Sequence, residues 1–587
     1  MLKEQDNIKA MFTEMKSKRS ESESLWTDIS NVCGITLDVQ YFNSPQSHSP
    51  NDKRDKYVDD PTAALSVIQA GDYIDGIMWG TGENAVTLEP SDYVANKSED
   101  AQTKKYFEWR TKQLLTNMNH GKAGFSTARK PYNYDQVAFG TSGIGVFLND
   151  NFKRGTDFHP YIFRNFGVDN CCIEEGINGQ VDIICIVYQW RVNRIVKEFN
   201  KVLNKLPKEI LQSQKDGDYN KEYTLVQAIY PRDNFHPTRK GKLGTRYKGA
   251  WFLDDGASSG DIFFEEDFKT MPIGMCRAIK VRGEPYGRSS GSLLISSILS
   301  VNYMFAQGIE NIEKKNNPAL GTFSNAVFGD SVVDTSANGL VPFNADFSGK
   351  GSPLWKLYDE GDPTALISFL IPYLNEKIAT GFKVDLLLDF ATEAGATATE
   401  IMKRSVIRNK ALSGLVGQQK NEMLEPVITR CIQIEDDNGL RGIDPRMDVQ
   451  GLNEARRLGK DEIIIPDAVL EAMLAGRPWY KIRYNNELER LNKTEQLERI
   501  MQAMNGISIL ASMSPQILEA IPFYDMLKDI NDALGLTYIK DEKEFKAIIA
   551  QQADIQQKAM LLQAGQAGAD IQGKLSKANK DEADAKK

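Results

Sequence analysis

The sequence predicts a helix-rich α+β protein, and three features support that prediction. The run from Ser289 to Ile309 has no charged side chain and is long enough for an extended helix packed by protein. Ahead of it, between Gly143 and Val281, short β-rich runs alternate with Gly, Asn and Asp. Behind it, a second long helical stretch runs from Ala398 towards Gln433. Because 587 residues exceed one ordinary core, we expect several domains or an elongated subunit.

The N-terminal part is expected to form two helices followed by an antiparallel sheet or a small barrel. Residues 1 to 30 predict a charged helix, and Val58 to Trp79 predict a second one that Asp60 and Pro61 can start. The turn residues Asn178-Gly179 punctuate the strands that follow. The expected strands are Ile144 to Leu148, Val181 to Gln189, Tyr223 to Tyr230, Gly249 to Leu253, Asp261 to Phe264 and Arg277 to Val281.

The uncharged run is either a membrane span or a helix surrounded by protein. Six serines with Gly, Asn and Gln favour protein, because such a segment would insert poorly into lipid. Its larger apolar side chains follow a 4-3-4 spacing, which is typical of a helix seam. The seam residues are Leu294, Ile298, Val301 and Phe305, with Gly308 at the next step and Ser297 permitting close helix approach.

A second helix with the same spacing is expected after a small α/β insertion at residues 316–362. Asp362 and Pro363 can start it, and Pro372 should kink or restart it. The stretch from Leu388 to Gly395 then interrupts the pattern, before Thr397 and Glu400 show capping-box spacing. The second seam consists of Ile367, Ile371, Leu374 and Ile378, and the bend points of the later helix are Gly414, Gly417 and Pro426.

The sequence shows neither a phosphate-binding loop nor a metal-ligand spacing of histidines. Gly349-Lys350-Gly351-Ser352 lacks the first glycine of a phosphate-binding loop, so no ATP site is predicted. The four histidines lack metal-ligand spacing and are expected on surfaces or loops, and the six cysteines are expected to be reduced. Glu174-Glu175, Asp254-Asp255 and Asp436-Asp437 are interpreted as turn residues, with Mg²⁺ ligation as the alternative. We therefore expect no cofactor and no metal.

One basic stretch stands out in a chain whose net charge is −9. It is interpreted as a solvated loop between strands, or as a contact with DNA phosphates or an acidic partner. The cations are Arg232, Arg239, Lys240, Lys242, Arg246 and Lys248.

Three blocks resemble the portal, or head-to-tail connector, proteins of tailed bacteriophages, especially the short-tailed type. Tyr286-Gly287-Arg288 is similar to the family's turn before its first stem helix. Thr397-Ala398-Thr399-Glu400, with Leu424 to Arg430 further on, is similar to the start and end of its long wing helix. Val137 to Thr141 is a softer match before an apolar strand, and the blocks lie in the family's order.

The resemblance implies a division of the chain into wing, stem, clip and crown. The wing would comprise residues 1–285 and 397–480, and the stem helices residues 286–315 and 363–388. The remaining parts would be the clip at 316–362, a channel loop at 389–396, the crown at 481–550 and a partly disordered tail at 551–587. In the channel loop, Asp389, Phe390, Thr392 and Glu393 would face DNA, although this loop lacks the cation that short-tailed members commonly carry.

The resemblance further implies a non-enzymatic ring of about twelve copies at one vertex of a viral head. Double-stranded DNA would pass through it during packaging and ejection. Its partners would be the terminase large subunit, the major capsid and scaffolding proteins, and later tail adaptor proteins, with assembly in the bacterial cytoplasm. Two alternatives remain: a membrane channel that uses residues 289–309 as its span, and a packaging-associated nuclease that uses an acidic pair.

Overall fold

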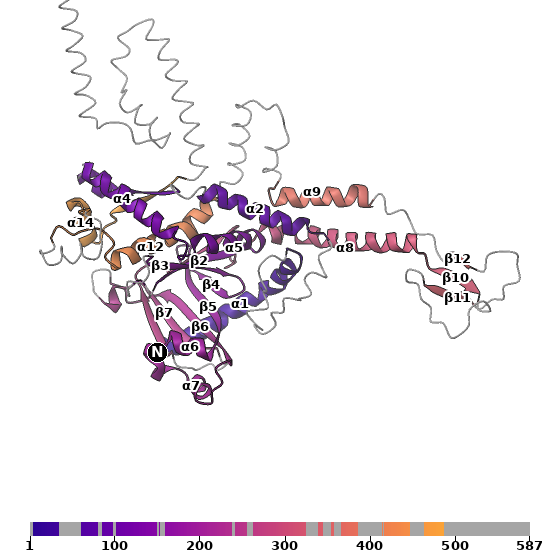
Figure 1. Cartoon of the computed structure of the whole chain (residues 1–587), viewed down its shortest axis with the longest axis horizontal. Helices are drawn as coiled ribbons and strands as arrows, with labels where there is room; N and C mark the ends of the chain where they lie inside the picture. Colours follow the sequence, from indigo (N-terminus) through magenta and orange to yellow (C-terminus); the bar gives the residue numbers. More distant parts are fainter. Residues whose placement is uncertain are drawn as a thin grey trace, which may run out of the picture. The chain divides into compact units, whose positions relative to one another are not determined.

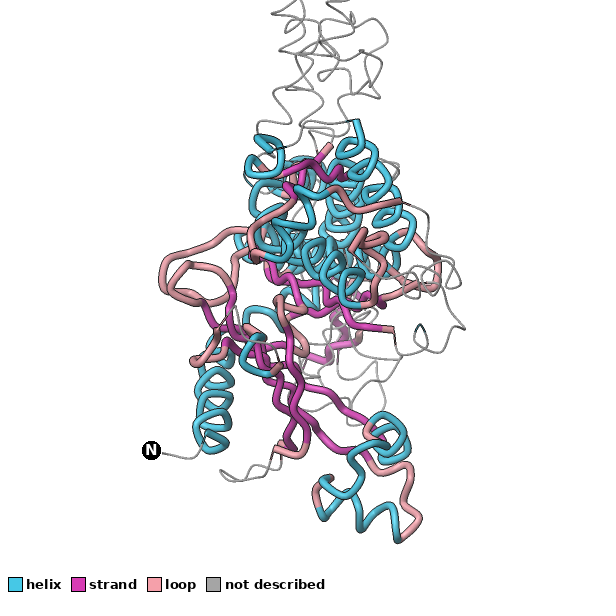
Figure 2. Tube along the Cα trace, turned by 90° about the vertical axis from the view of Figure 1, so that its left-hand side faces the viewer, coloured by secondary structure: helices cyan, strands magenta, loops and turns pink. Residues whose placement is uncertain are grey.

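The computed structural model (Figures 1 and 2) divides the chain into two units, Met1–Asn486 and Glu487–Lys587. All described residues belong to the first unit. They are residues 4–33, 60–79, 85–97, 101–149, 152, 159–236, 241–254, 262–323, 339–343, 354–356, 366–384, 414, 416–446 and 463–485. Helices and antiparallel strands both contribute to this unit, which confirms the predicted α+β class.

The first two helices are α1 (Glu4–Cys33) and α2 (Thr62–Trp79), as the sequence predicts. The second begins at Thr62 because the Asp60 carboxylate accepts hydrogen bonds from the Thr62 amide, at 3.0 Å, and from its hydroxyl, at 2.6 Å. Strand β1 (Val86–Pro90) pairs antiparallel with β13 (Tyr480–Tyr484), a pairing that the sequence patterns did not predict. Between β1 and the sheets lie three helices: α3 (Asp92–Lys97), α4 (Ala101–Met118) and α5 (Phe125–Ala138).

A three-stranded antiparallel sheet has the order β3–β2–β9. Its strands are β2 (Thr141–Leu148), β3 (Tyr161–Gly167) and β9 (Ile273–Arg277). The expected strand from Arg277 to Val281 was wrong, because the strand ends at Arg277. Ile273 and Met275 are buried in the sheet, whereas Ile279 is exposed in the segment that leads to the next helix.

A five-stranded antiparallel sheet has the order β4–β5–β6–β7–β8. Three strands match the prediction to within two residues: β5 (Val181–Arg191), β6 (Glu222–Pro231) and β7 (Tyr247–Leu253). Strand β4 (Cys171–Glu175) was missed, and β8 (Phe264–Phe268) begins where a strand was expected to end. Since β4 and β8 do not pair with each other, the described strands form an open sheet and not a barrel.

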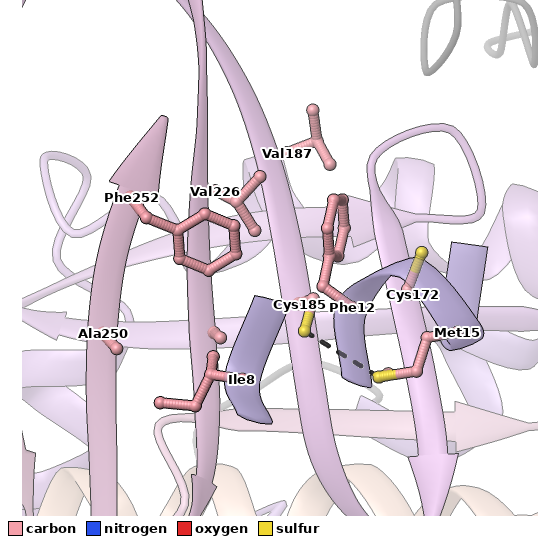
Figure 3. Packing of buried hydrophobic residues seen from close by; sticks show 10 residues of the cluster. Ile8, Phe12, Met15, Cys172, Cys185, Val187, Val226, Ala250 and Phe252 are labelled. Atoms are coloured by element: carbon pink, nitrogen blue, oxygen red, sulfur yellow. Dashed lines mark hydrogen bonds between the residues drawn. The ribbon is translucent and has the colours of Figure 1, made fainter. Parts of the chain in front are cut away.

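Both faces of this sheet are covered. On one face, Ile8, Phe12 and Met15 of α1 pack on alternate residues of the strands, such as Cys185 and Phe252 (Figure 3). On the other face, Trp190, Leu225, Trp251 and Leu253 pack under a short helical layer. That layer consists of α6 (Val192–Glu198), a 3₁₀ segment (Asn200–Lys205) and α7 (Lys208–Lys215).

The uncharged run forms most of α8 (Ser290–Asn316), and α9 (Ile371–Gly381) packs against this helix. In the intervening segment, β10 (Leu320–Phe323) pairs parallel with β11 (Leu340–Phe343) and antiparallel with β12 (Leu354–Lys356). A π-helical turn, Leu366–Leu370, ends just before Pro372 in α9. This agrees with a helix that is restarted at the proline, which lacks an amide hydrogen for the turn before it.

A second π-helical turn, Lys420–Leu424, precedes Pro426 at the start of α12 (Glu425–Asp437). The π turn thus lies just before Pro426, the position where a bend was expected. The helix ends at Asp437 instead of Gln433, and α14 (Asp467–Leu474) follows in the described part.

Candidate functional site

The turn before α8 is the best candidate site because two of the sequence blocks meet there. Tyr286 is buried, its ring packs edge-on against Trp26 with centroids 4.9 Å apart, and its hydroxyl accepts a hydrogen bond from the Ile173 amide at 3.4 Å. Burial raises the pKa of the Tyr286 hydroxyl well above its usual value, so this group stays neutral. Tyr286 therefore ties the turn to α1 and to strand β4.

Gly287 and Gly140 interlock at this turn. The Gly287 amide donates a hydrogen bond to Thr141 Oγ1 at 2.8 Å, and a Cβ on Gly287 would lie 2.5 Å from the Gly140 carbonyl oxygen. Gly140 has a positive φ of 83°, and its own Cβ would lie 2.6 Å from the Gly287 oxygen. Neither position has room for a side chain, so both glycines are required by close backbone contact.

The first turn of α8 is held by Ser289 and Gly291. The Ser289 hydroxyl accepts a hydrogen bond from the Ser292 amide and donates one to the Ala138 carbonyl at 2.6 Å, and Ser292 completes a capping box. A Cβ on Gly291 would lie 2.4 Å from the same Ala138 oxygen. Residues 286–291 therefore fix the start of α8 on residues 138–141, and we call this contact the α8 anchor.

Beyond the anchor, α8 has a buried face and also exposes apolar side chains. Ile298, Val301 and Gly308 are buried, as the seam predicts, while Leu294, Ser297 and Phe305 are partly buried. Asn302 is also buried, and its side chain accepts a hydrogen bond from the Asp60 amide at 3.0 Å. The exposed apolar residues are Leu293, Leu299, Tyr303, Ile309 and Ile312, of which Leu293 and Tyr303 are 65% and 68% exposed.

The composition of α8 would also permit a membrane span. Its most apolar window has a mean hydropathy of 1.3, and 22% of that window is buried. Among the described helices it alone passes a test of length and composition for a span. Leu293, Leu299 and Tyr303 of α8 are exposed in the described part of this single chain, so packing of the helix by protein on every side stays a prediction.

Helix α9 repeats this arrangement. Ile371 and Ile378 are buried, Leu374 is partly buried, and a Cβ on Gly381 would lie 2.5 Å from Leu294 Cδ1 of α8. Phe369 and Tyr373 are nevertheless 75% and 55% exposed. Ile367 lies in the π turn, and its side chain lies outside the described part. The helix pair thus packs tightly together and still presents apolar side chains outward.

An ion-pair network around Arg277 supports the α8 anchor. The Arg277 side chain is fully buried, and its guanidinium lies 2.6 Å from Glu422 Oε1 and 2.8 Å from Glu175 Oε2. The Arg277 amide also donates to Glu422 at 2.9 Å. The Lys280 ammonium, 2.7 Å from Glu175, lowers the pKa of that carboxyl, and Arg277 adds to the effect. Arg277 therefore joins β9, β4 and the π turn before α12.

A second buried network joins α4, β3 and α12. The Arg110 guanidinium lies 2.5 Å from Glu435 and 2.7 Å from Asp436, and Asn117 and Tyr161 also donate hydrogen bonds to Glu435. Burial raises the pKa of Glu435 and raises that of Asp436 to about 6. Two carboxylates facing one guanidinium leave an excess negative charge, which protonation would relieve.

These contacts correct the interpretation of two acidic pairs, Glu174-Glu175 and Asp436-Asp437, as turn residues. Glu174 and Glu175 end strand β4, and Asp436 and Asp437 end helix α12. Asp437 pairs with Lys269, and Asp254 lies 3.3 Å from Lys16. Within the described ranges no group of His, Cys, Asp and Glu could hold a metal ion. The five described residues of these pairs each form an ion pair with a basic side chain.

Comparison with known proteins identifies the family. Residues 5–449 match the family described as bacteriophage head to tail connecting protein. The chain belongs to this family. A curated relative, the "Probable portal protein" of Bordetella phage BPP-1, is 23% identical over 440 residues, which is 73% of this chain and 75% of the relative. The resemblance seen in the sequence blocks is thereby confirmed.

Two solved structures are also similar in part to this connector. One is described as the virion of a native gene transfer agent (GTA) particle, with 13% identity, a TM-score of 0.28, and coverage of 73% of this chain and 92% of that chain. The other is the neck of an empty GTA particle, with 12% identity, a TM-score of 0.30, and coverage of 73% and 93%. The family assignment rests on the sequence matches alone.

Three of the six cations in the basic stretch of the connector form ion pairs with acids of β8. The stretch runs from the end of β6 into the start of β7, so most of it lies between these strands, as the sequence predicts. Arg232 pairs with Asp267, and Lys248 and Lys242 lie 3.0 and 3.8 Å from Glu265. The Arg246 guanidinium lies 5.5 Å from the Tyr247 ring centroid. Arg239 and Lys240 lie outside the described residues.

Several predicted sites of the connector also lie outside the described residues. They are the channel-loop residues Asp389, Phe390, Thr392 and Glu393, and the block residues Thr397, Thr399 and Glu400. Arg288 of the described block is exposed and pairs with Glu284. All six cysteines are buried and free, as expected. His159 lies in the loop before β3, in line with the expected surface or loop placement, although it is buried and stacks on His120 with centroids 4.9 Å apart.

Sequence reasoning missed Arg277, Arg110 and Trp26. A single arginine in a sequence looks the same whether it is buried or exposed, and its carboxylate partners lie more than a hundred residues away. The available signal was the acidic residues themselves, since Glu175 and Asp436 follow apolar stretches that end at a buried network.

Proposed function

We propose that this connector is a portal protein that forms a ring at one vertex of the capsid. The exposed apolar faces of α8 and α9 carry this proposal. Apolar side chains gain about 25 cal/mol per Å² when they leave water, and soluble chains rarely leave such patches uncovered. A neighbouring copy of the same chain covers them if the helix pairs stand side by side around an axis.

In this arrangement the chain acts as the passage for double-stranded DNA during packaging and ejection. The terminase large subunit docks on it first, and tail adaptor proteins dock after the head is filled. Contacts with the major capsid and scaffolding proteins place it in the virion after assembly in the host cytoplasm. Support comes from the family and from the curated relative that is named a portal protein. The chain itself is proposed to be a structural element and not an enzyme.

Ring formation is tested by changing the exposed face of α8. In the double variant Leu293→Arg, Tyr303→Arg the two charges repel the neighbouring copy, so we expect monomers in mass photometry and negative-stain images where the wild type forms rings. The matched control is Tyr219→Arg, which places the same charge at another exposed aromatic position. Normal rings from the double variant would show that α8 does not lie at a subunit contact. Recovery of the wild type in washed membranes would favour the membrane-channel alternative.

The passage of DNA is tested at the channel loop, residues 389–396. Since Asp389 and Glu393 are its charged residues, the acidic loop is proposed to repel phosphate and let DNA slide. Changing both to Lys should give rings that bind DNA tightly and in a salt-dependent way, with slower packaging. Unchanged affinity and packaging rate would place the loop away from DNA. Cleavage of DNA by the wild type with Mg²⁺ would instead support the nuclease alternative.

A further inference from the structure

A pocket of about 320 Å³ opens between strand β3 and the face of β5 that carries α6. Its lining includes Arg164, Asn170, Tyr188, Gln189, Trp190 and Arg194. It therefore has two arginines and several amides, and no acidic residue belongs to its lining. Such a set of hydrogen-bond donors suits an anion.

The two arginines are held in place without an ion pair. The Arg194 guanidinium lies over the Trp190 ring at 4.5 Å from the centroid, and the Arg164 guanidinium lies over the Phe147 ring at 5.5 Å. Among the described residues, neither has a carboxylate within ion-pair distance. Aromatic stacking orients a guanidinium and leaves its N–H groups available for a ligand.

The helical layer that begins beside the pocket, at Arg194, is rich in basic residues. Residues 191–208 hold six cations and one acid, in a chain with an overall charge of −9. Arg191 pairs with Glu222 at 3.1 Å, whereas the five other cations have no acidic partner in the described part of the chain. Arg194 and Lys197 are three residues apart in α6, which places them on one side of that helix. All five side chains are exposed, and they are Arg194, Lys197, Lys201, Lys205 and Lys208.

We propose that this pocket and its basic rim bind an acidic peptide segment of a partner protein, with a carboxylate side chain between Arg164 and Arg194. A carboxylate matches the planar guanidinium fork, and the flanking lysines attract the acidic residues on one side of it. The helical layer lies beside the five-stranded sheet and away from α8 and α9 (Figure 1), so this surface is separate from the apolar faces that the ring would bury.

Nucleic acid fits the site less well. Single strands are held by bases that stack on open aromatic faces. Here the Trp190 face is covered by Arg194, and Tyr188 is stacked on Trp251 with centroids 5.3 Å apart. The edge of β3 also has few backbone amides left to bind a ligand. The Phe163 and Gly167 amides already donate hydrogen bonds to Ala123 and Asn170. Recognition thus depends on the side chain that enters the pocket.

The test measures binding of the full-length chain to fluorescein-labelled deca-glutamate by fluorescence anisotropy. Deca-glutamine and a labelled 20-base-pair DNA duplex serve as comparison probes. We expect deca-glutamate to bind and deca-glutamine not to bind. Arg164→Gln with Arg194→Gln should weaken deca-glutamate binding at least tenfold, because two charge-assisted contacts are lost. Lys205→Gln with Lys208→Gln should weaken it only two- to threefold and reduce its salt dependence.

The matched control is Arg282→Gln with Arg446→Gln, which removes two exposed arginines elsewhere and should leave binding unchanged. Circular dichroism checks that each variant is folded, and Arg164→Lys with Arg194→Lys, which keeps the charge and loses the fork, should bind with intermediate affinity. The proposal is overturned if the pocket variant binds like the wild type, if the rim variant loses as much as the pocket variant, or if duplex DNA binds more tightly through the same two arginines.

Discussion

Replacing Gly287 with Ala tests whether the α8 anchor is held by backbone contact. The new Cβ would lie 2.5 Å from the Gly140 oxygen, 2.8 Å from Arg277 Cβ and 2.9 Å from Arg277 Cα. Real Cβ atoms do not approach other atoms so closely, and two of these neighbours are backbone atoms that cannot rotate away. Inserting one carbon into such a site costs about 3 kcal/mol, the upper part of the usual range for overpacking.

The size of the unit converts this cost into a melting temperature. Unfolding entropy is about 2.1 cal/mol/K per residue, which gives about 1 kcal/mol/K for a unit as long as Met1–Asn486. The variant should therefore melt about 3 °C lower in differential scanning fluorimetry. Limited proteolysis should cut it sooner near residues 286–291, because the anchor opens first.

A matched control lies in α2. Gly76 is exposed, and a Cβ there would meet nothing within 4 Å. Gly76→Ala should stabilise the chain by about 0.5–1 kcal/mol, since alanine is the better helix former. If Gly287→Ala melts with the wild type while Gly76→Ala behaves as expected, the close packing of the two glycines does not hold α8 in place.

Two further predictions concern the buried networks. Arg277→Met leaves Glu422 buried without its guanidinium, so it should cost about 3–5 kcal/mol; adding Glu422→Gln should restore part of this loss, and equal melting of the single and double variants would contradict the role of Arg277. Asp436 has a pKa of about 6, above the ordinary value of 3.8, so the folded chain binds this proton more strongly than the unfolded chain does. Its contribution to stability is therefore full below pH 4 and is lost as pH rises through 6. Asp436→Asn should remove about 1 kcal/mol of the wild type's loss between pH 5 and pH 8, measured as thermal stability at each pH, and identical pH profiles would show that Asp436 does not titrate in this range.

The sequence predicted the helices well where a local signal was strong. The uncharged run from Ser289 to Ile309 and its apolar spacing predicted α8, which extends to Asn316. Strands β5 and β6 were found because long β-branched runs end at turn residues. Two expected strands were wrong, those at Asp261 to Phe264 and Arg277 to Val281. A short run does not show which of its residues the sheet will bury.

The anchor and the ion networks could be predicted only in part. The Tyr286-Gly287-Arg288 block was visible, but its contact with Gly140 depends on the pairing of Thr141 with Arg277 across β2 and β9. Such pairings are set by tertiary packing and leave no local pattern. The pocket beside α6 was invisible for the same reason, since β3 was missed and Arg164 with it.

The α8 anchor also has a consequence for the order in which the chain folds during synthesis. All strands of both the three- and the five-stranded sheets precede residue 286, so their residues are synthesised, and emerge from the ribosome, before those of α8. The costly long loop between β2 and β9 can close first, and α8 then docks on a finished surface as it emerges. Strand β1 must instead wait for β13, near the end of the unit. Helix α8 thus packs early against its own chain, before it can contact α8 of another nascent copy.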